Sequence, residues 1–287
     1  MVNFLTHYGS DKVKHGVLSS AYLFWSSSEL MLTLTSYLTP LDWSFASHGY
    51  IGAVGLLIIG IIFGLYRCRP IRQFDFVDSV SGQQITVKTG DLFDEEGNLV
   101  VGMSDCFDTE LGDVINQDSI QGQLVNRLYS GDLKKLDKDL RLALRNKSLQ
   151  PVIDSQKTRG KNKRYPIGTT ISLSVGSRKV ICCAYSSMGA DLVTQVDAGS
   201  VWCSLMEIWQ SVRTFGGMQP ISIPIIGTDR ARVHGSPKHQ VMAKAILLSY
   251  LFCARSGKIS NRMTVVVSPA DLGKVSMYEL RDFLEHA

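Results

Sequence analysis

An uncharged apolar stretch near the N-terminus constrains this chain more than any other feature of its sequence. Residues 44–66 contain no Asp, Glu, Lys or Arg, and residues 51–65 are almost all aliphatic or glycine. About 20 apolar residues are enough for a helix to cross the hydrocarbon core of a bilayer. A buried helix of a soluble domain is a poor alternative at this length and glycine content. We therefore predict a transmembrane helix at about residues 46–66.

A second apolar stretch, residues 16–38, precedes the first and is richer in Ser and Thr. Together the two stretches predict a helical hairpin with a short turn at residues 39–43, within an N-terminal membrane region of residues 1–70. A cleaved signal peptide fits poorly, because a second span follows the first and a small-residue cleavage site does not. Positively charged flanks stay in the cytoplasm, so both termini are predicted to be cytoplasmic. The flanking basic residues are Lys12, Lys14, Arg67, Arg69 and Arg72.

Three residues of the hairpin point to more than anchoring. Glu29 lies near the middle of the first stretch, where a carboxylate is costly unless it is protonated or faces a partner helix or a cavity. Gly60 and Gly64 form a Gly-x-x-x-Gly pair, which lets another helix approach closely. Two interpretations stay open: the glycines pack the two spans of one chain, or they mediate self-association. One hairpin cannot form a pore, so lytic activity would require an oligomer.

The composition is that of a folded protein. The 287 residues are 45% hydrophobic and 20% charged, unlike a disordered chain. A net charge of +4 is too small to indicate nucleic-acid binding. Six cysteines are scattered without a Cys-x-x-Cys pair, so we predict reduced thiols, with neither disulfides nor a metal site.

Beyond a short amphipathic linker at residues 71–84, strand-like and helix-like segments alternate. The predicted strands are residues 85–88, 99–103, 169–173, 180–184, 221–226 and 264–267. The predicted helices are residues 120–129, 133–144, 201–215, 237–253 and 270–284. Strands interleaved with helices predict an α/β fold, a three-layer α/β/α domain over residues 85–287 whose mixed sheet is covered on both faces.

A basic stretch at residues 155–164 interrupts this alternation. Most such runs are solvated surface loops. The alternative is contact with anionic lipid headgroups beneath the bilayer. The basic residues of the stretch are Lys157, Arg159, Lys161, Lys163 and Arg164.

Three segments lie where ligands bind in α/β domains, in loops between the carboxyl end of a strand and a helix. They are residues 90–93, 118–124 and 227–237. Small residues in the second and third would let backbone N–H groups approach phosphates. The chain has neither a P-loop nor a Gly-x-Gly-x-x-Gly fingerprint, which argues against an NTPase or a dinucleotide oxidoreductase.

In order and spacing, these segments resemble those of a macro domain. Gly90-Asp91-Leu92 is similar to the family's Gly-Asp-Ile, whose Asp holds the adenine amino group. Residues 98–104 resemble the strand that usually ends in an Asn-rich turn. Residues 119–124 (Ser-Ile-Gln-Gly-Gln-Leu) resemble the first phosphate loop, typically Gly-Val-Ala-Gly-Ala-Ile, and residues 224–228 (Pro-Ile-Ile-Gly-Thr) resemble the second. The resemblance extends from about residue 85 to the C-terminus and implies a macro-like fold.

The resemblance implies a pocket for ADP-ribose or a derivative of it, without a further cofactor or a metal. It places the ligand at the three segments and at the turn after the strand of residues 98–104. The ligand-binding residues that it implies are Asp91, Leu92, Asp105, Phe107, Asp108, Ser119, Ile120, Gln121, Gly122, Gly227, Thr228, Asp229, Arg230 and Arg232. Gly122 and Gly227 are expected where the pyrophosphate comes closest to the main chain.

The departures from the family pattern concern catalysis. Hydrolytic macro domains usually show an Asn-Ala-Ala-Asn run and a Gly-Gly-Gly turn, and here residues 103–109 and 116–118 occupy those places. The Asn that would orient the distal ribose is missing, so no catalytic residue is predicted. Asp105 and Asp108 keep acid–base chemistry open as an alternative, although acids in a loop more often form turns or accept hydrogen bonds from ribose.

A membrane hairpin fused to a divergent macro domain is similar to the effector subunit of type II Thoeris, a bacterial antiphage defence system. The resemblance implies a multi-pass protein of the bacterial inner membrane. A partner with a TIR domain would make an ADP-ribose derivative, such as histidine-linked ADP-ribose, and the macro domain would sense it. Hairpins of a homo-oligomer would then disrupt the membrane and abort the infection. No nucleic-acid partner is implied.

Two other function classes stay open. One is a membrane-tethered ADP-ribosyl hydrolase, which the missing Asn disfavours. The other is a passive anchor or scaffold with a degenerate pocket. Turnover assays separate the first from a sensor, and a ligand-dependent thermal shift separates the second, because a bound ligand stabilises only the folded state.

Overall fold

The computed structural model describes residues 71–147, 149–227 and 239–287. Nearly all of them belong to the unit Arg72–Ala287, one of two into which the chain divides. Within the described ranges, no helix is both long and apolar enough to cross a bilayer. The predicted hairpin lies outside those ranges. The predicted functional residues outside them are Glu29, Gly60, Gly64, Thr228, Asp229, Arg230 and Arg232.

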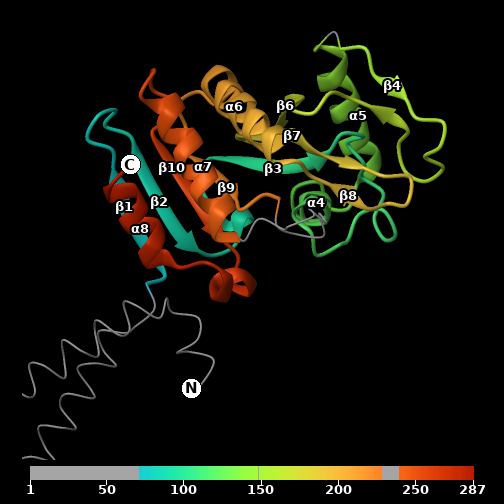
Figure 1. Cartoon of the computed structure of the whole chain (residues 1–287). Coiled ribbons are helices and arrows are strands. Elements are labelled where there is room, and N and C mark those ends of the chain that lie inside the picture. The colour runs from blue at the N-terminus through green and yellow to red at the C-terminus, as the bar shows by residue number, and fades with distance from the viewer. Residues whose placement is uncertain (1–70, 148, 228–238) are drawn as a thin grey trace, which may run out of the picture. The chain divides into compact units, whose positions relative to one another are not determined.

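A mixed β-sheet forms the centre of the described unit (Figure 1). Its strands are β1 (Gln73–Val77), β2 (Gln84–Thr89), β3 (Asn98–Ser104), β6 (Thr170–Val175), β7 (Arg178–Met188), β8 (Thr194–Gln195), β9 (Ile221–Pro224) and β10 (Arg262–Val267). They lie in the order β1-β2-β10-β9-β3-β7-β6, and β8 pairs with β7. The run from β2 to β7 is parallel, whereas β1, β6 and β8 pair antiparallel at the margins. The predicted mixed sheet is therefore confirmed.

Helices and a small hairpin complete the unit. The helical elements are η1 (Leu92–Asp94), α4 (Ile120–Gln123), η2 (Leu124–Leu128), α5 (Leu133–Arg145), α6 (Ala198–Phe215), α7 (His239–Ala254), η3 (Pro269–Lys274) and α8 (Met277–Glu285). The hairpin consists of β4 (Val152–Ile153) and β5 (Lys163–Arg164), which pair antiparallel. Asp132 is the N-cap residue of α5. Its carboxylate accepts a hydrogen bond from the backbone N–H of Lys135, which otherwise has no partner within the helix.

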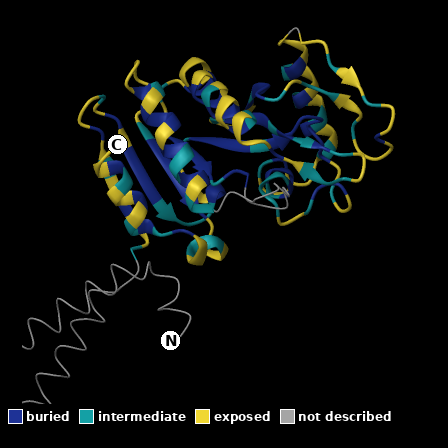
Figure 2. Cartoon of the chain, in the orientation of Figure 1, coloured by how far each residue is buried: buried dark blue, intermediate teal, exposed yellow. Residues whose placement is uncertain are grey.

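Alternate residues of the central strands serve different layers of the fold. Leu99, Val101 and Met103 of β3 belong to a core cluster that also contains the buried leucines of α5. On the other face, the thiol of Cys183 in β7 lies 3.8 Å from the carbonyl oxygen of Ser204 in α6. Both faces of these strands are buried (Figure 2). Because side chains on both faces lie in the core, the sequence of each parallel strand is a nearly continuous run of apolar residues. The helices thus form layers on both faces of the sheet.

The predicted linker at residues 71–84 is wrong in part, because it contains strand β1. Phe74 of this strand is buried, and Asp75 accepts a 2.6 Å hydrogen bond from the Thr86 hydroxyl of β2. The strand closes one edge of the sheet by antiparallel pairing with β2. Five residues at a sheet edge give only a short pattern, and three of them are exposed, so the sequence signal is weak.

Two predicted helices also differ from the structure. The helix predicted at residues 120–129 is α-helical only as far as Gln123 and continues as the π-helical turn η2. The helix predicted at residues 270–284 is divided into η3 and α8. The division falls at Ser276, whose hydroxyl accepts a hydrogen bond from the N–H of Glu279 and so starts a new helix.

Candidate functional site

A cavity of about 590 Å³ opens at the carboxyl ends of three parallel strands. The ends of β3, β7 and β9 contribute its base, and the loops at residues 113–121 and 192–194 contribute its walls. Ligands of open α/β sheets bind at this edge because the connecting loops and their backbone groups converge there. The lining residues include Gly102, Ser104, Asn116, Ser119, Ile120, Gln121, Tyr185, Ser186, Leu192, Thr194, Ile226 and Gly227.

Two glycines, Gly102 and Gly227, lie at the base of the cavity. A Cβ atom at Gly102 would lie 2.5 Å from the ring of Tyr185, so the tyrosine occupies the space that a side chain would fill. Gly227 has a φ of +79°, which side chains rarely tolerate. A Cβ atom there would also lie 3.1 Å from the terminal methyl of Met242. The positive φ therefore favours glycine at Gly227, whereas the flexible end of the Met242 side chain would have to shift only slightly for a Cβ atom.

The wall segment at residues 116–123 is fixed by its own hydrogen bonds. The Ser119 hydroxyl donates to the carbonyl of Asn116 at 2.6 Å and accepts from the N–H of Gly122 at 3.1 Å. The side-chain amide of Gln123 donates to the carbonyl of Asp118 at 3.0 Å. These bonds hold the wall in shape, so Ser119, Ile120 and Gln121 line a preformed cavity.

Gly122 belongs to this segment, but it is buried and does not line the cavity. A Cβ atom there would lie 2.4 Å from the carbonyl oxygens of both Asn116 and Gln117. The loop itself therefore needs glycine at this position, whatever the ligand. The expectation that a pyrophosphate comes close to the main chain at Gly122 stays a prediction beside this packing requirement.

The comparisons with known proteins bear on this domain. The family model described as "Thoeris protein ThsA, Macro domain" matches residues 85–268, which contain β2 except its first residue, all elements from β3 to β10, and the described cavity lining. The chain belongs to the Thoeris ThsA macro-domain family. No curated protein matches the chain.

Solved macrodomains share the fold. A mutant of the Oceanobacillus iheyensis macrodomain superposes with a TM-score of 0.51 at 14% identity, over 76% of this chain and 100% of that one. The same macrodomain with ADP gives a TM-score of 0.50 at 15% identity, over 75% of this chain and 98% of that one. The predicted macro-like fold is confirmed.

Asp91 of the Thoeris macro domain lies away from the cavity lining. Its carboxylate accepts a 2.8 Å hydrogen bond from the N–H of Phe93 and so caps η1. The other carboxylate oxygen lies 2.5 Å from the guanidinium of Arg127. Leu92 is buried in the core and also does not line the cavity. An adenine-binding role for Asp91 stays a prediction, and it would require sharing this carboxylate with Arg127.

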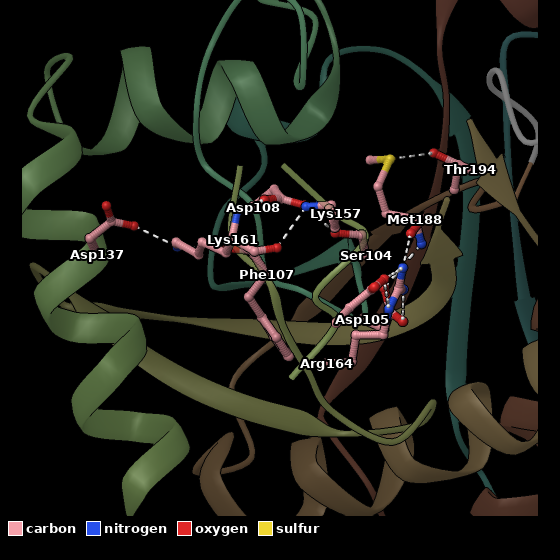
Figure 3. A network of polar contacts seen from close by, with 11 residues as sticks. Ser104, Asp105, Phe107, Asp108, Asp137, Lys157, Lys161, Arg164, Met188 and Thr194 are labelled. Atoms are coloured by element: carbon pink, nitrogen blue, oxygen red, sulfur yellow. Dashed lines mark hydrogen bonds and ion pairs between the residues drawn. The ribbon is translucent and has the colours of Figure 1, made fainter. Parts of the chain in front are cut away.

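Asp105, Phe107 and Asp108 also lie outside the cavity lining, in a network of polar contacts (Figure 3). Asp105 accepts a 3.0 Å hydrogen bond from the N–H of Met188 and forms a 2.6 Å ion pair with Arg164. Phe107 has a φ of 49° and packs in the core, edge-on to the ring of Tyr165. Asp105 thus fastens the end of β3 to the end of β7.

Asp108 is fully buried and pairs with residues of the basic stretch. Its carboxylate lies 2.8 Å from the ammonium of Lys157 and accepts a 2.6 Å hydrogen bond from the N–H of Lys161. The side chain of Lys161 donates to the carbonyl of Phe107 and pairs with Asp137 at 2.6 Å. Asp108 does not line the cavity, so its predicted role in ligand binding stays a prediction.

Most residues of the basic stretch are exposed, as the surface-loop interpretation predicts, and the alternative of contact with lipid headgroups stays a prediction. A solvated loop is wrong for Lys157, whose side chain is fully buried, and Arg164 is held between Asp105 and Asp154. The guanidinium of Arg164 holds the pKa of Asp154 below its usual range. Arg159 pairs with Asp113 on the cavity wall. The acidic residues at 105–113 were the sequence signal that the basic stretch could form ion pairs. Which acidic and basic residues meet depends on the fold.

The described thiols do not supply a nucleophile to the cavity. Cys106, Cys182 and Cys183 are buried, and none of them lines it. Burial raises the pKa of Cys106 to about 12 and of Cys183 to about 11, so both remain protonated. Within the described ranges, no group of three or more His, Cys, Asp or Glu side chains is arranged to hold a metal ion.

Among the described residues, four predicted site residues line the cavity: Ser119, Ile120, Gln121 and Gly227. The structure adds residues that no sequence motif marked, chiefly Tyr185 and Ser186 at the end of β7 and the loop at residues 192–194. Strand β7 was predicted, but its end carries no glycine-rich turn. Its place beside β3 in the sheet is what brings these residues to the cavity.

Proposed function

We propose that this macro domain binds an ADP-ribose-type nucleotide in the cavity at the ends of β3, β7 and β9. The cavity itself carries the proposal: about 590 Å³ falls within the roughly 300–1,000 Å³ of small-molecule sites. Its walls are preformed by hydrogen bonds within residues 116–123. The shared fold with a macrodomain solved with ADP supports a nucleotide diphosphate as the ligand class.

We further propose that the domain is the sensor of a membrane-anchored Thoeris effector. The family assignment supports a place in Thoeris defence. The apolar stretches at residues 16–38 and 46–66 support an inner-membrane anchor with both termini in the cytoplasm. A TIR-domain partner would supply the ADP-ribose-derived signal, and a homo-oligomer of the anchor would disrupt the membrane.

A sensor is favoured over an ADP-ribosyl hydrolase by the positions of Asp105 and Asp108. Asp105 and Asp108, the two candidates for acid–base work, are held by Arg164 and Lys157 and do not line the cavity. A general acid or base has to reach the proton that it transfers. We therefore expect binding without turnover, which product analysis after prolonged incubation with ADP-ribosylated protein tests.

Calorimetric titration of the full-length protein with ADP-ribose tests the site. Wild type is expected to bind one equivalent. Val193→Trp should abolish or greatly weaken binding, because the larger side chain enters the cavity that Val193 lines. Val241→Trp is the matched control, since Val241 is exposed on α7 and lies outside the lining. Absence of binding in wild type, or equal binding by both variants, would refute the cavity assignment.

A leakage assay tests the effector role. Full-length protein in dye-loaded vesicles is expected to release the dye when the nucleotide signal is added. The Val193→Trp protein should stay silent under the same conditions. Release that does not depend on the nucleotide, or no release although the nucleotide binds, would count against a ligand-triggered membrane effector.

A further inference from the structure

The solvent-exposed face of α5 carries positive charge only. Buried leucines hold the inner face of this helix in the core. Six residues of α5 are exposed, and none of them is acidic. One is Leu142, which is 50% exposed. The other five define the α5 basic face, which lies outside the basic stretch of residues 155–164: Lys134, Lys135, Lys138, Arg141 and Arg145.

The two acidic residues of α5 are engaged within the domain and do not neutralise this face. Asp137 forms a 2.6 Å ion pair with Lys161 and accepts a 2.7 Å hydrogen bond from the Thr109 hydroxyl. Asp139 accepts a 3.1 Å hydrogen bond from the hydroxyl of Tyr129. The helix therefore separates its charges, with acidic groups toward the domain and basic groups toward solvent.

The α5 basic face keeps all of its positive charges. None of its five residues forms an ion pair with any residue that the structure describes. The ammonium group of Lys135 lies 5.9 Å from the ring centroid of Tyr129, and Nε of Arg141 donates to the carbonyl of Asp137 at 3.2 Å. Neither contact brings an opposite charge to the face.

This arrangement works against the stability of the helix. Like charges four residues apart destabilise a helix, and the face holds two such pairs, Lys134 with Lys138 and Arg141 with Arg145. Lys134 and Lys135 also lie in the first turn, where the positive end of the helix dipole repels cations. A face that is only solvated surface usually mixes both signs. A face of one sign, placed against the electrostatics of its own helix, indicates a partner of negative charge.

Two observations favour a lipid surface over a nucleic acid as that partner. Leu142 lies among the cations, three and four residues from Arg145 and Lys138, and an aliphatic side chain can enter the boundary between headgroups and acyl chains. The exposed residues of α5 include no aromatic side chain on which a base could stack. Anionic lipids of the cytoplasmic leaflet attract clusters of about four to eight Lys and Arg, and the α5 basic face is of this size.

We propose that the α5 basic face docks the macro domain on the anionic headgroups of a lipid bilayer. The inference rests on the proposed membrane anchor, which brings the domain to a lipid surface. The five cations supply the attraction, and Leu142 enters the headgroup boundary. Docking therefore requires anionic lipid and weakens with salt, because salt screens exposed charges. The face shares no residue with the described cavity lining, so nucleotide binding can be measured independently.

Lysine acetylation of the full-length protein tests the docking. The protein is reconstituted into vesicles of phosphatidylcholine alone or with added phosphatidylglycerol, treated briefly with an acetylating ester, and analysed by mass spectrometry. Lys134 and Lys138 are expected to react about fivefold more slowly in the anionic vesicles. High salt should restore their rates. Lys258, which is exposed beyond the end of α7, is the internal control and should react equally in both vesicles.

A charge-reversed variant links the slowing to the α5 basic face. Lys134→Glu combined with Arg145→Glu should abolish the lipid-dependent slowing at Lys138, whereas the control Lys258→Glu should keep it. The double variant should melt no lower than wild type, because opposite charges replace like charges four residues apart. Both variants should bind ADP-ribose as wild type does, because these positions lie outside the described cavity lining.

Equal rates at Lys138 in both kinds of vesicle would overturn the proposal, and so would equal slowing at Lys138 and Lys258. Slowing by added DNA or RNA but not by phosphatidylglycerol would make a nucleic acid the partner and overturn it as well. Failure of wild type to float with the vesicles would defeat the proposed anchor, and this inference with it. Failure of wild type to bind ADP-ribose would defeat the proposed ligand site and leave the docking surface standing.

Discussion

The ammonium group of Lys157 lies 2.8 Å from the carboxylate of Asp108, and neither side chain is exposed to solvent. The lysine also donates to the carbonyl of Lys161 at 2.7 Å, and the carboxylate accepts from the N–H of that residue. A Cβ atom at Gly160 would lie 2.4 Å from the same carboxylate, so the turn closes over the pair only with glycine there. This ion pair ties the basic stretch to the loop that follows β3.

Lys157→Met should destabilise the domain strongly, because it leaves a buried carboxylate without its counter-charge. Breaking a buried pair from one side costs about 3–5 kcal/mol. For a unit of this size that lowers the melting temperature by roughly 10 °C, at about 2–4 °C per kcal/mol. Lys163→Met on the exposed strand β5 is the matched control and should change the stability by less than about 0.5 kcal/mol. Equal melting of the two variants would show that the pair contributes nothing.

Gly122→Ala should unfold the cavity wall even without ligand. Its Cβ would meet two carbonyl oxygens at 2.4 Å, and overpacking of this kind costs about 1–3 kcal/mol. Thermal denaturation of the unliganded protein measures this loss. Gly199→Ala in α6 serves as the control, since only the Asp197 carboxylate lies near its Cβ position. If Gly122→Ala melts like wild type and only its nucleotide affinity falls, the glycine serves the ligand after all.

Asp91→Ala tests two roles of this residue, the observed cap of η1 and the predicted contact to adenine. Loss of the η1 cap should cost about 0.5–2 kcal/mol of stability, measured by denaturant unfolding. Loss of the predicted contact to the adenine amino group should also weaken ADP-ribose binding by about tenfold to a hundredfold.

Arg127→Ala is the matched control for Asp91. It removes the ion pair while leaving the cap, and it frees the carboxylate for the ligand. Binding should then stay equal or become tighter. If Asp91→Ala loses stability but keeps its affinity, the residue is only a helix cap.

Asp78 should make the stability of the domain depend on pH in the acid range. Although burial raises its pKa, hydrogen bonds from Arg255 and Ser81 outweigh this and hold the pKa at about 2, against 3.8 for the free group. Because the folded pKa is the lower one, the stabilisation is fully present above about pH 4 and is lost as the pH falls through 2. The contribution is at most about 2.5 kcal/mol.

Urea unfolding of wild type and Asp78→Asn at several pH values isolates this contribution. The variant should be less stable at pH 7, and the difference from wild type should shrink between about pH 4 and pH 2. A constant difference across that range would show that the carboxylate charge of Asp78 does not stabilise the fold.

The membrane topology remains a prediction from the basic flanks of residues 16–66. A reporter fused after Ala287 should read as cytoplasmic, because Arg67, Arg69 and Arg72 follow the second apolar stretch. A reporter before Lys12 should read the same way. Opposite readings at the two ends would mean that only one of the two stretches crosses the bilayer.

The sequence by itself determined most of the elements and their order. Apolar runs at β3, β7 and β10 and the leucine spacing of α5 are local patterns, and each reports the environment of its own segment. The glycine at Gly227 and the Ser119 turn of the cavity wall likewise follow from local backbone requirements. These signals sufficed for the fold class and for part of the cavity.

Only the tertiary structure decided which segments meet. Met103 of β3 pairs with Ala184 of β7, and this register brings Tyr185 and Ser186 to the cavity. The same packing joins Asp108 to Lys157 and buries this one lysine of a basic run that is otherwise largely exposed. Partners this far apart along the chain leave no periodic signal, because their contact depends on the order and register of the strands between them. The sequence also gives no sign that the side-chain nitrogen of Gln121 is buried without a hydrogen-bond partner, because both properties depend on the folded loop.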